Sequence, residues 1–200
     1  MAHSVWKFIW EEDSWASWFV NIILAFLIIK FIVYPGLGLI LNTSYPIVAV
    51  VSGSMEHDGS FDKWWSSSAL CGQKSCSQEE YYLQEGITRE DFQEFPFENG
   101  FNIGDIMILY GTTPEDVRVG EVIVFRSFRA DPIIHRVITV KEKNGEASFT
   151  TKGDHNAASF SFESYIPEDV YLGRAVVRIP YLGYIKIGFV KLIGLFQLIV

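Results

Sequence analysis

The sequence contains few cysteines, and this shortage excludes several kinds of site. Cys71 and Cys76 are the only two, and no C-x₂-C or H-x₃-H spacing accompanies the four histidines. We therefore expect no zinc site, and no other metal or cofactor. The two cysteines stand five residues apart in a polar segment, where they could form a disulfide if that segment lies outside the cytosol.

Basic residues are also scarce, with 16 Lys and Arg against 24 Asp and Glu and a net charge of −8. All but three of the acidic residues lie between positions 42 and 180, together with 12 of the basic ones. Nucleic-acid binding requires a basic stripe that neutralises phosphates. This acidic middle therefore excludes nucleic acid as a partner.

Apolar residues, by contrast, make up 49% of the chain and gather at its two ends. Residues 18–41 are almost wholly apolar, long enough to cross ~30 Å of hydrocarbon as a helix. Tryptophans are interleaved in and just after residues 1–17, at Trp6, Trp10, Trp15 and Trp18. Such residues are typical of the membrane interface. We predict an interfacial segment followed by a transmembrane anchor.

Lys30 is the one charged residue in this run. If the span begins near Trp15, Lys30 stands in its outer part, where its long stem lets the amine reach the interface. Pro35 and Gly36 then predict a kink or the exit from the membrane. A buried core helix is the alternative. A cleavable signal peptide is disfavoured, because the run is long, the preceding residues are not basic, and no small-x-small site follows promptly.

The middle of the chain consists of short apolar segments separated by glycine-bearing turns. The predicted strands cover residues 47–51, 106–110, 121–126, 133–140, 147–152 and 171–179. Lys143-Asn144-Gly145-Glu146 is a hairpin turn. This pattern predicts a mostly β protein with a compact antiparallel β domain.

We place this β-rich domain at residues 42–183, with an insertion at residues 59–100. The insertion keeps no regular hydrophobic period, and we expect in it one short helix near residues 88–95. Its aromatic side chains either pack on the domain, which we favour, or touch the bilayer surface. Residues 184–200 are again apolar and predict a C-terminal membrane helix or, as the alternative, an interfacial helix.

Three polar features accompany the predicted strands. Ser-Gly-Ser-Met at 52–55 ends the first strand, and Gly53 lets the backbone turn so that Ser54 stands at a strand end. A serine needs a nearby base and oxyanion donors to act as a nucleophile. His135 lies within a predicted strand, and Asp154 follows another in Thr-Lys-Gly-Asp-His-Asn. Singly, they are an ordinary strand histidine and a turn residue. Together, they supply a nucleophile, a base and a carboxylate.

The order of these motifs resembles a known family. An apolar anchor is followed by Ser-Gly-Ser-Met, Gly-Asp, Gly-Glu-Val-Ile-Val-Phe, Ile-His-Arg-Val, Thr-Lys-Gly-Asp-x-Asn and Arg-Ile-Pro-Tyr-Leu-Gly. The chain is in this respect similar to type I signal peptidases, specifically the archaeal and endoplasmic-reticulum branch. In the bacterial branch a lysine base stands where this sequence has His135.

The resemblance implies a membrane-bound serine endopeptidase that removes signal peptides at the extracytoplasmic surface of the membrane. Ser54 would be the nucleophile and His135 the general base, with the Ser52 hydroxyl and the Ser54 N–H stabilising the oxyanion. The implied partners are signal peptides of exported preproteins, bound as extended strands with small residues at the first and third positions before the cut. The lipid bilayer and the export machinery are further implied partners.

One departure from the family concerns the carboxylate that orients the histidine. Relatives often carry an aspartate six residues beyond the Gly-Asp aspartate, where this sequence has Phe160. Either Asp154 takes the orienting role, which we favour, or Glu163 reaches in.

Two other functions stay open at this point. Lys152 would be the base of a Ser-Lys dyad in a self-processing regulatory protease if burial lowered its pKa. Alternatively, the chain is a non-catalytic, membrane-tethered β module that captures extended peptides.

Overall fold

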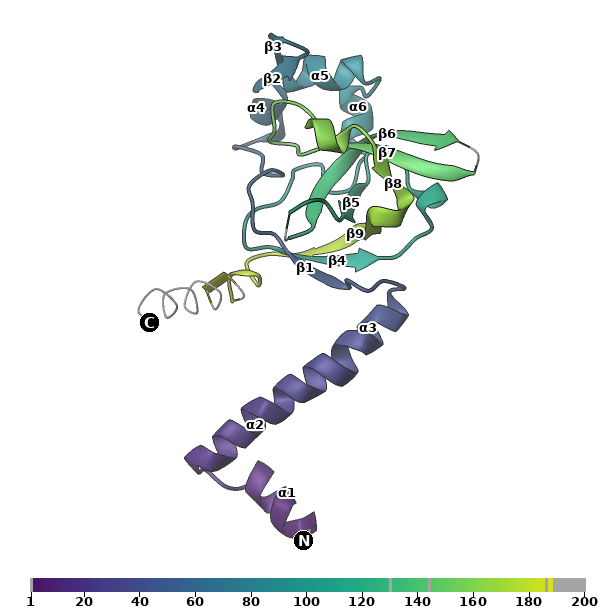
Figure 1. The fold of residues 1–200 in the computed structure, drawn as a ribbon. Helices are drawn as coiled ribbons and strands as arrows, with labels where there is room; N and C mark the ends of the chain where they lie inside the picture. Colours follow the sequence, from purple (N-terminus) through teal and green to yellow (C-terminus); the bar gives the residue numbers. More distant parts are fainter. Residues whose placement is uncertain (1, 130, 144, 186, 189–200) are drawn as a thin grey trace.

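A computed structural model describes residues 2–129, 131–143, 145–185 and 187–188. A β-rich body is joined to an N-terminal helical arm (Figure 1). The body is a curled antiparallel sheet, so the predicted fold class, mostly β with an apolar N-terminal helix, is confirmed.

Seven strands form the main sheet in the order β1-β4-β9-β5-β6-β7-β8, and all neighbours are antiparallel. Their bounds are β1 Ile47–Ala49, β4 Ile106–Tyr110, β5 Val122–Phe125, β6 Ile133–Lys143, β7 Glu146–Lys152, β8 Ile166–Pro167 and β9 Tyr171–Ile179. Single turns of 3₁₀ helix lie between strands: η2 Pro114–Asp116, η3 Ser161–Glu163 and η4 Glu168–Val170. The predicted hairpin joins β6 to β7, with Lys143 paired to Glu146 and residue 144 outside the described residues.

The sheet is buried on both faces around β5, whose four residues are all inaccessible to solvent. Successive side chains of a strand point to opposite faces. Val122 and Val124 accordingly pack in one apolar cluster with Met55 and Met107, whereas Ile123 and Phe125 pack in a second cluster with Phe149. The strand beside β5, which carries His135, is thereby fixed between two cores.

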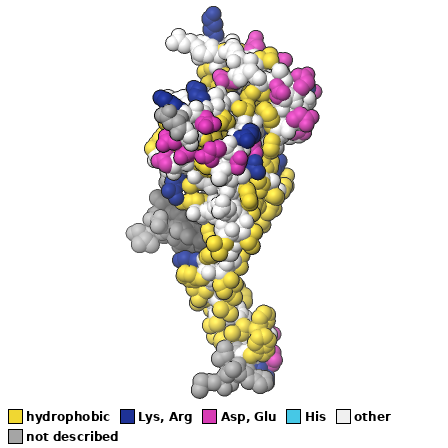
Figure 2. Space-filling model, turned by 90° about the vertical axis from the view of Figure 1, so that its right-hand side faces the viewer, with side chains coloured by type: hydrophobic (Ala, Val, Ile, Leu, Met, Phe, Trp, Pro, Cys, Tyr) yellow, Lys and Arg dark blue, Asp and Glu magenta, His cyan; other side chains and the backbone are white. Residues whose placement is uncertain are grey.

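The helical arm consists of α1 (Ala2–Trp10), α2 (Trp15–Ile28), the π-helical turn η1 (Ile29–Val33) and α3 (Tyr34–Ile40). The last three form one helix, Trp15–Ile40, of 26 residues and mean hydropathy 2.3, long and apolar enough to cross a membrane. None of its most apolar 18-residue window is buried, so the alternative of a buried core helix is wrong. Apolar side chains cover this part of the surface, while acidic ones gather on the body (Figure 2).

The predicted kink or exit at Pro35 does not end the helix, which continues to Ile40. Proline lacks an N–H and its ring clashes with the carbonyl four residues earlier, which normally breaks a helix. Here η1 precedes the proline, and the Tyr34 N–H donates to Ile29 O, five residues back. This wider turn accommodates Pro35 in the first turn of α3.

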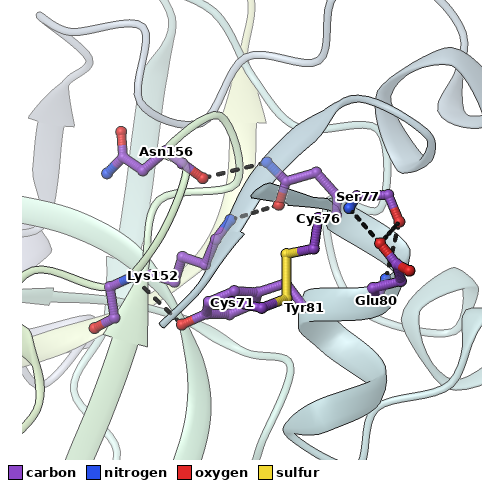
Figure 3. Close-up of a disulfide and its surroundings, with 9 residues drawn as sticks. Cys71, Cys76, Ser77, Glu80, Tyr81, Lys152 and Asn156 are labelled. Carbon is purple, nitrogen blue, oxygen red and sulfur yellow. Dashed lines mark hydrogen bonds between the residues drawn. A yellow bond between two sulfur atoms is a disulfide. The ribbon is translucent and has the colours of Figure 1, made fainter. Parts of the chain in front are cut away.

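The region predicted as an insertion holds more structure than expected. Its elements are α4 Phe61–Trp65, β2 Ser68–Cys71, β3 Lys74–Ser77, α5 Gln78–Gln84 and α6 Arg89–Gln93. Helix α6 is the one predicted near residues 88–95, and the other four were missed. A disulfide joins Cys71 to Cys76 across the β2–β3 hairpin (Figure 3). Trp64, Trp65 and Phe92 are buried in one aromatic cluster, in agreement with packing rather than bilayer contact.

The predicted C-terminal membrane or interfacial helix at 184–200 lies largely outside the described residues, which end at residue 188.

Candidate active site

Ser54 lies in a tight turn just after β1. The chain leaves the sheet at Val50, and the Glu56 N–H donates to Gly53 O at 3.1 Å to close the turn. The next side chain, Met55, is fully buried and fixes the turn against the core. Ser54 O accepts a hydrogen bond from the His155 N–H at 2.9 Å. The half-buried Ser54 side chain is therefore held by its own backbone at the edge of the body.

His135 lies on β6, opposite Ile123 of β5. Its side chain is 7% exposed, and its Nε2 is 2.9 Å from Ser54 Oγ. In the sheet order, β4, β9 and β5 lie between β1, which precedes the turn of Ser54, and β6, which carries His135. The curl of the sheet therefore brings together a hydroxyl and an imidazole that are 81 positions apart.

Glu163 contacts the other ring nitrogen of His135. The η3 turn directs its carboxylate to His135 Nδ1, with which it forms a hydrogen bond through Oε1. Oε1 also accepts from Thr151 Oγ1 at 3.0 Å, and Oε2 accepts from the Phe160 N–H at 3.1 Å. A carboxylate on Nδ1 fixes the tautomer that leaves Nε2 free to accept a proton.

Asp154, the carboxylate favoured from the sequence for orienting His135, faces a different partner. Arg136 Nη2 donates to Asp154 Oδ2 at 2.8 Å and Arg136 Nε to Oδ1 at 2.9 Å. Adjacent strand residues point to opposite faces, so the ring of His135 and the guanidinium of Arg136 separate. Asp154 therefore lies on the same face as the Arg136 guanidinium, whereas Glu163 contacts the ring of His135. The carboxylate that contacts His135 is thus that of Glu163 and not, as favoured from the sequence, that of Asp154.

The environment of Asp154 is that of a structural carboxylate. His57 Nε2 lies 3.1 Å from Oδ2, and the Tyr82 hydroxyl donates to Oδ1 at 3.2 Å. Burial alone would raise the pKa of Asp154, but the Arg136 guanidinium and His57 outweigh it and hold that pKa well below its usual range. Asp154 therefore links Tyr82 of the insertion, and His57 just before it, to Arg136 of β6.

Lys152, the alternative base, is buried beside Tyr81 and the disulfide (Figure 3). Burial lowers its pKa to about 7. Its Nζ donates to Gln78 Oε1 at 2.8 Å, Gly153 O at 3.1 Å and Asp154 O at 3.3 Å. Within the described residues its hydrogen bonds thus go to these three acceptors, and Ser54 is not one of them.

Ser52 is exposed, and its Oγ lies 3.2 Å from Ser54 Oγ. The Ser54 N–H donates to no backbone carbonyl among the described residues. A free N–H and a hydroxyl beside a nucleophile are the groups that can stabilise a developing oxyanion.

Gly153 is a site residue that the sequence analysis did not single out. A Cβ built on it would lie 2.7 Å from Ser54 O and 2.8 Å from His135 Nε2. No larger residue fits without displacing one of them. The Lys-Gly-Asp motif does contain this glycine, but a glycine in a turn is common and does not by itself indicate a tight approach to the site.

The pair opens onto a cavity of about 340 Å³. Its lining is mostly apolar and comes from β1 and the residues that follow it, from β6 and the loop before it, and from the segment after β7. The apolar members are Val48, Ala49, Val51, Pro132, Ile133, Ile134, Phe160 and Phe162. Asn156 also lines it, a second residue missed from the sequence. In the described parts of the chain, no group of three or more His, Cys, Asp or Glu side chains is arranged to hold a metal.

A serine hydroxyl, an imidazole and a buried carboxylate in series are the arrangement found in serine hydrolases of several unrelated folds. Here they lie on an antiparallel β body joined to an apolar helix. Comparison with known proteins narrows this class. No protein-family profile matches the chain.

The chain is similar to the signal peptidase complex catalytic subunit SEC11C of Homo sapiens, with 36% identity over 97 residues, 45% of this chain and 50% of that protein. The SEC11C subunit of Mus musculus gives the same values. The signal peptidase complex catalytic subunit SEC11 of Verticillium alfalfae is 26% identical over 164 residues, 78% of this chain and 71% of that protein.

The chain spans about half the length of the mammalian relatives it matches. The resemblance to type I signal peptidases of the endoplasmic-reticulum branch, predicted from the motifs, is confirmed by these named relatives.

Proposed function

We propose that this protein is a membrane-anchored serine endopeptidase that removes N-terminal signal peptides from exported preproteins. The observation that carries the proposal is the continuous series from Glu163 through His135 to Ser54, with Ser54 Oγ 2.9 Å from His135 Nε2. The named relatives, all catalytic subunits of signal peptidase complexes, supply the substrate class.

In the proposed reaction, Ser54 Oγ attacks the carbonyl carbon of the scissile bond while its proton passes to His135 Nε2. Glu163 stabilises the imidazolium through Nδ1. The tetrahedral intermediate collapses, the C–N bond breaks, and the leaving amine takes the proton from Nε2. Water then hydrolyses the acyl-enzyme, with His135 again accepting and returning one proton.

The oxyanion of each tetrahedral intermediate would be stabilised by the Ser54 N–H and the Ser52 hydroxyl. Both are close to the attacking oxygen, and the Ser52 hydroxyl is solvent-exposed and can rotate toward the substrate. Loss of one such donor typically costs ~10²–10³ in kcat.

The substrate would bind as an extended strand along the cavity between β1 and β6. Ala49 and Val51 on one side and Ile133 on the other line a space of about 340 Å³ beside Ser54. An extended peptide presents alternate side chains to such a wall. We propose that the residues at the first and third positions before the cut are small, as the resemblance implies.

The proposed organisation follows from the arm and the disulfide. Residues 1–17 form an interfacial segment, residues 18–41 the anchor, and residues 42–183 the peptidase domain with its insertion at 59–100. Disulfides persist in oxidising compartments. The Cys71–Cys76 bond therefore favours an extracytoplasmic location for the peptidase domain. Because the relatives are subunits of a complex, we also propose accessory subunits as partners.

The two alternatives have less support. A Ser-Lys protease requires the amine of Lys152 at Ser54, whereas His135 is bonded there and Lys152 donates elsewhere. A non-catalytic peptide-binding module gives no reason for a buried carboxylate on the far side of a histidine bonded to a serine.

The proposal is tested with detergent-solubilised protein and a preprotein. Wild type should release the signal peptide, while Ser54→Ala and His135→Ala should not. Ser148→Ala, on β7 and away from the cavity, is the matched control and should cut like wild type. Equal cleavage by all four proteins would refute the proposal, and cleavage that survives His135→Ala but not Lys152→Ala would establish the Ser-Lys alternative.

A further inference from the structure

The turn at residues 153–156 is attached to the nucleophile through its backbone. The Asn156 N–H donates to Gly153 O at 2.9 Å, and the His155 N–H donates to Ser54 O at 2.9 Å. Trp64 Nε1 donates to Asp154 O at 3.0 Å from the insertion. The backbone of this turn therefore has a fixed position relative to Ser54.

Asn156 has a polar group left over in this arrangement. Its backbone carbonyl oxygen accepts from Gln78 Nε2 at 3.2 Å, and its backbone N–H closes the turn. Its side-chain Nδ2, however, is buried without a hydrogen-bond partner in the described part of the chain. An unmet buried donor is destabilising and is uncommon in folded proteins. Since Asn156 lines the cavity beside Ser54 and His135, its free donor lies where a substrate would bind.

The position of Gly153 shows which part of a substrate this donor would meet. A Cβ on Gly153 would lie 2.6 Å from Asn156 Nδ2 and 2.8 Å from His135 Nε2, so both nitrogens border the same point. Nε2 must deliver its proton to the leaving amine. The residue that follows the scissile bond must therefore lie beside these two neighbouring nitrogens, and its carbonyl oxygen is the first backbone acceptor after the cut.

We propose that Asn156 is a substrate-binding residue whose Nδ2–H donates to the backbone carbonyl of the residue just after the scissile bond. This inference rests on the proposed function and extends it. The contact holds the leaving segment beside His135 Nε2, so that the amine is protonated as the C–N bond breaks. A backbone acceptor is present in every preprotein, so this contact places no demand on side chains after the cut.

The experiment compares two substrates on the full chain in detergent. One is a peptide that extends several residues beyond the cut, and the other is a nitrophenyl ester of the same acyl residues, which has no carbonyl after the cut. The variants are Asn156→Ala and Asn156→Asp, which replaces the donor with acceptors at nearly the same size. His155→Ala is the matched control, because its exposed ring lies on the same turn outside the cavity.

We expect both Asn156 variants to lower kcat/KM for the peptide about 10–100-fold, the range of one to two hydrogen-bond losses, and to hydrolyse the ester within about twofold of wild type. His155→Ala should match wild type on both substrates. Equal losses on both substrates would mean that Asn156 only maintains the Ser54–His135 pair, and no loss on either would mean that it meets no substrate. Both results overturn the inference.

Failure of the proposed function gives a different result. In that case wild type cleaves neither substrate, or Ser54→Ala remains fully active, and the inference about Asn156 fails with it. If Ser54→Ala abolishes both activities, the proposed function stands and only the Asn156 comparison decides the inference.

Discussion

At the scale of single residues, two neighbours on β6 each meet a different carboxylate. His135 bonds to Glu163 on one face, and Arg136 bonds to Asp154 on the other. Both carboxylates are fully buried, so burial does not distinguish a catalytic role from a structural one. The partner does, since an imidazole can transfer a proton at neutral pH and a guanidinium cannot.

This difference predicts opposite results for two conservative substitutions. Glu163→Gln should lower kcat by up to about 10⁴-fold with little change in thermal stability, because the amide favours the wrong tautomer of His135. Asp154→Asn should lower the free energy of unfolding by about 3–5 kcal/mol, because it leaves the charge of Arg136 buried and unpaired. Preprotein cleavage and thermal unfolding of each variant provide the measurements.

If instead Asp154→Asn lowered kcat and Glu163→Gln lowered only stability, Asp154 would be the orienting carboxylate. Glu163→Asp serves as the control, because it keeps the charge at a shorter reach and should retain part of the activity.

Lys152 gives the protein a pH dependence that is independent of catalysis. Burial lowers the pKa of this amine from 10.5 to about 7. Between those pH values the unfolded chain binds a proton that the folded chain does not, so stability should rise with pH across this window. Relative to Lys152→Met, the wild type should gain stability from pH 7 to pH 9.5, with a slope of at most about 1.4 kcal/mol per pH unit.

Chemical unfolding of both proteins in the same detergent, at several pH values, measures this slope. Parallel curves for wild type and Lys152→Met would show that the folded protein holds this amine in its charged form. Lys141→Met, at the exposed end of β6, is the control for loss of an ordinary lysine.

At the scale of elements, the site depends on how closely the turn at 153–156 approaches the loop after β1. Gly153→Ala should fold, with a loss of about 1–3 kcal/mol from overpacking. Its methyl group would displace His135 Nε2 or Ser54 O, and misplacement by about 1 Å can cost 10²-fold in rate. We therefore expect kcat to fall at least 100-fold.

Gly36→Ala, in α3, is the matched control, since nothing lies within 4 Å of a Cβ at that glycine and its φ is not positive. Full activity in Gly153→Ala would show that the turn yields, and that the tight approach is not required for the reaction.

Elements with a strong local signal were predictable from the sequence. β4 and β9 begin and end at the predicted residues: β4 is an apolar run that follows the turn signal Gly104-Asp105, and β9 ends just before Pro180. The four missed elements of the insertion are four to seven residues long. Helices of that length are not stable alone. They are held by the aromatic cluster, the disulfide and the capping residues Ser60 and Ser77, which come together only in the folded chain.

The residues of the candidate site likewise divide into those that could be predicted from the sequence and those that could not. Ser54 and His135 could be proposed because each lies in a recognisable motif at a strand or strand end. Glu163 could not be preferred over Asp154, because its reach depends on one 3₁₀ turn and on the bond from the Phe160 N–H. Asn156 and Gly153 carry no signal beyond turn chemistry.

At the scale of the whole molecule, the apolar helix and the disulfide support the orientation in the membrane that we propose. Helix Trp15–Ile40 separates α1 from the β body, so a spanning helix places these two parts on opposite sides of the membrane. The body contains the Cys71–Cys76 bond and most of the acidic residues, and both suit an oxidising aqueous compartment.

This orientation predicts the outcome of labelling in sealed vesicles that carry the protein in its native direction. Cys71 and Cys76 should not react with a maleimide until a reductant is added, because they are joined in a disulfide. After reduction they should react with a membrane-impermeant maleimide only from the extracytoplasmic side. A cysteine introduced at Glu12, between α1 and α2, is the internal control and should react from the other side. Labelling of Cys71 and Cys76 from the cytoplasmic side would invert the topology and separate the Ser54 site from exported substrates.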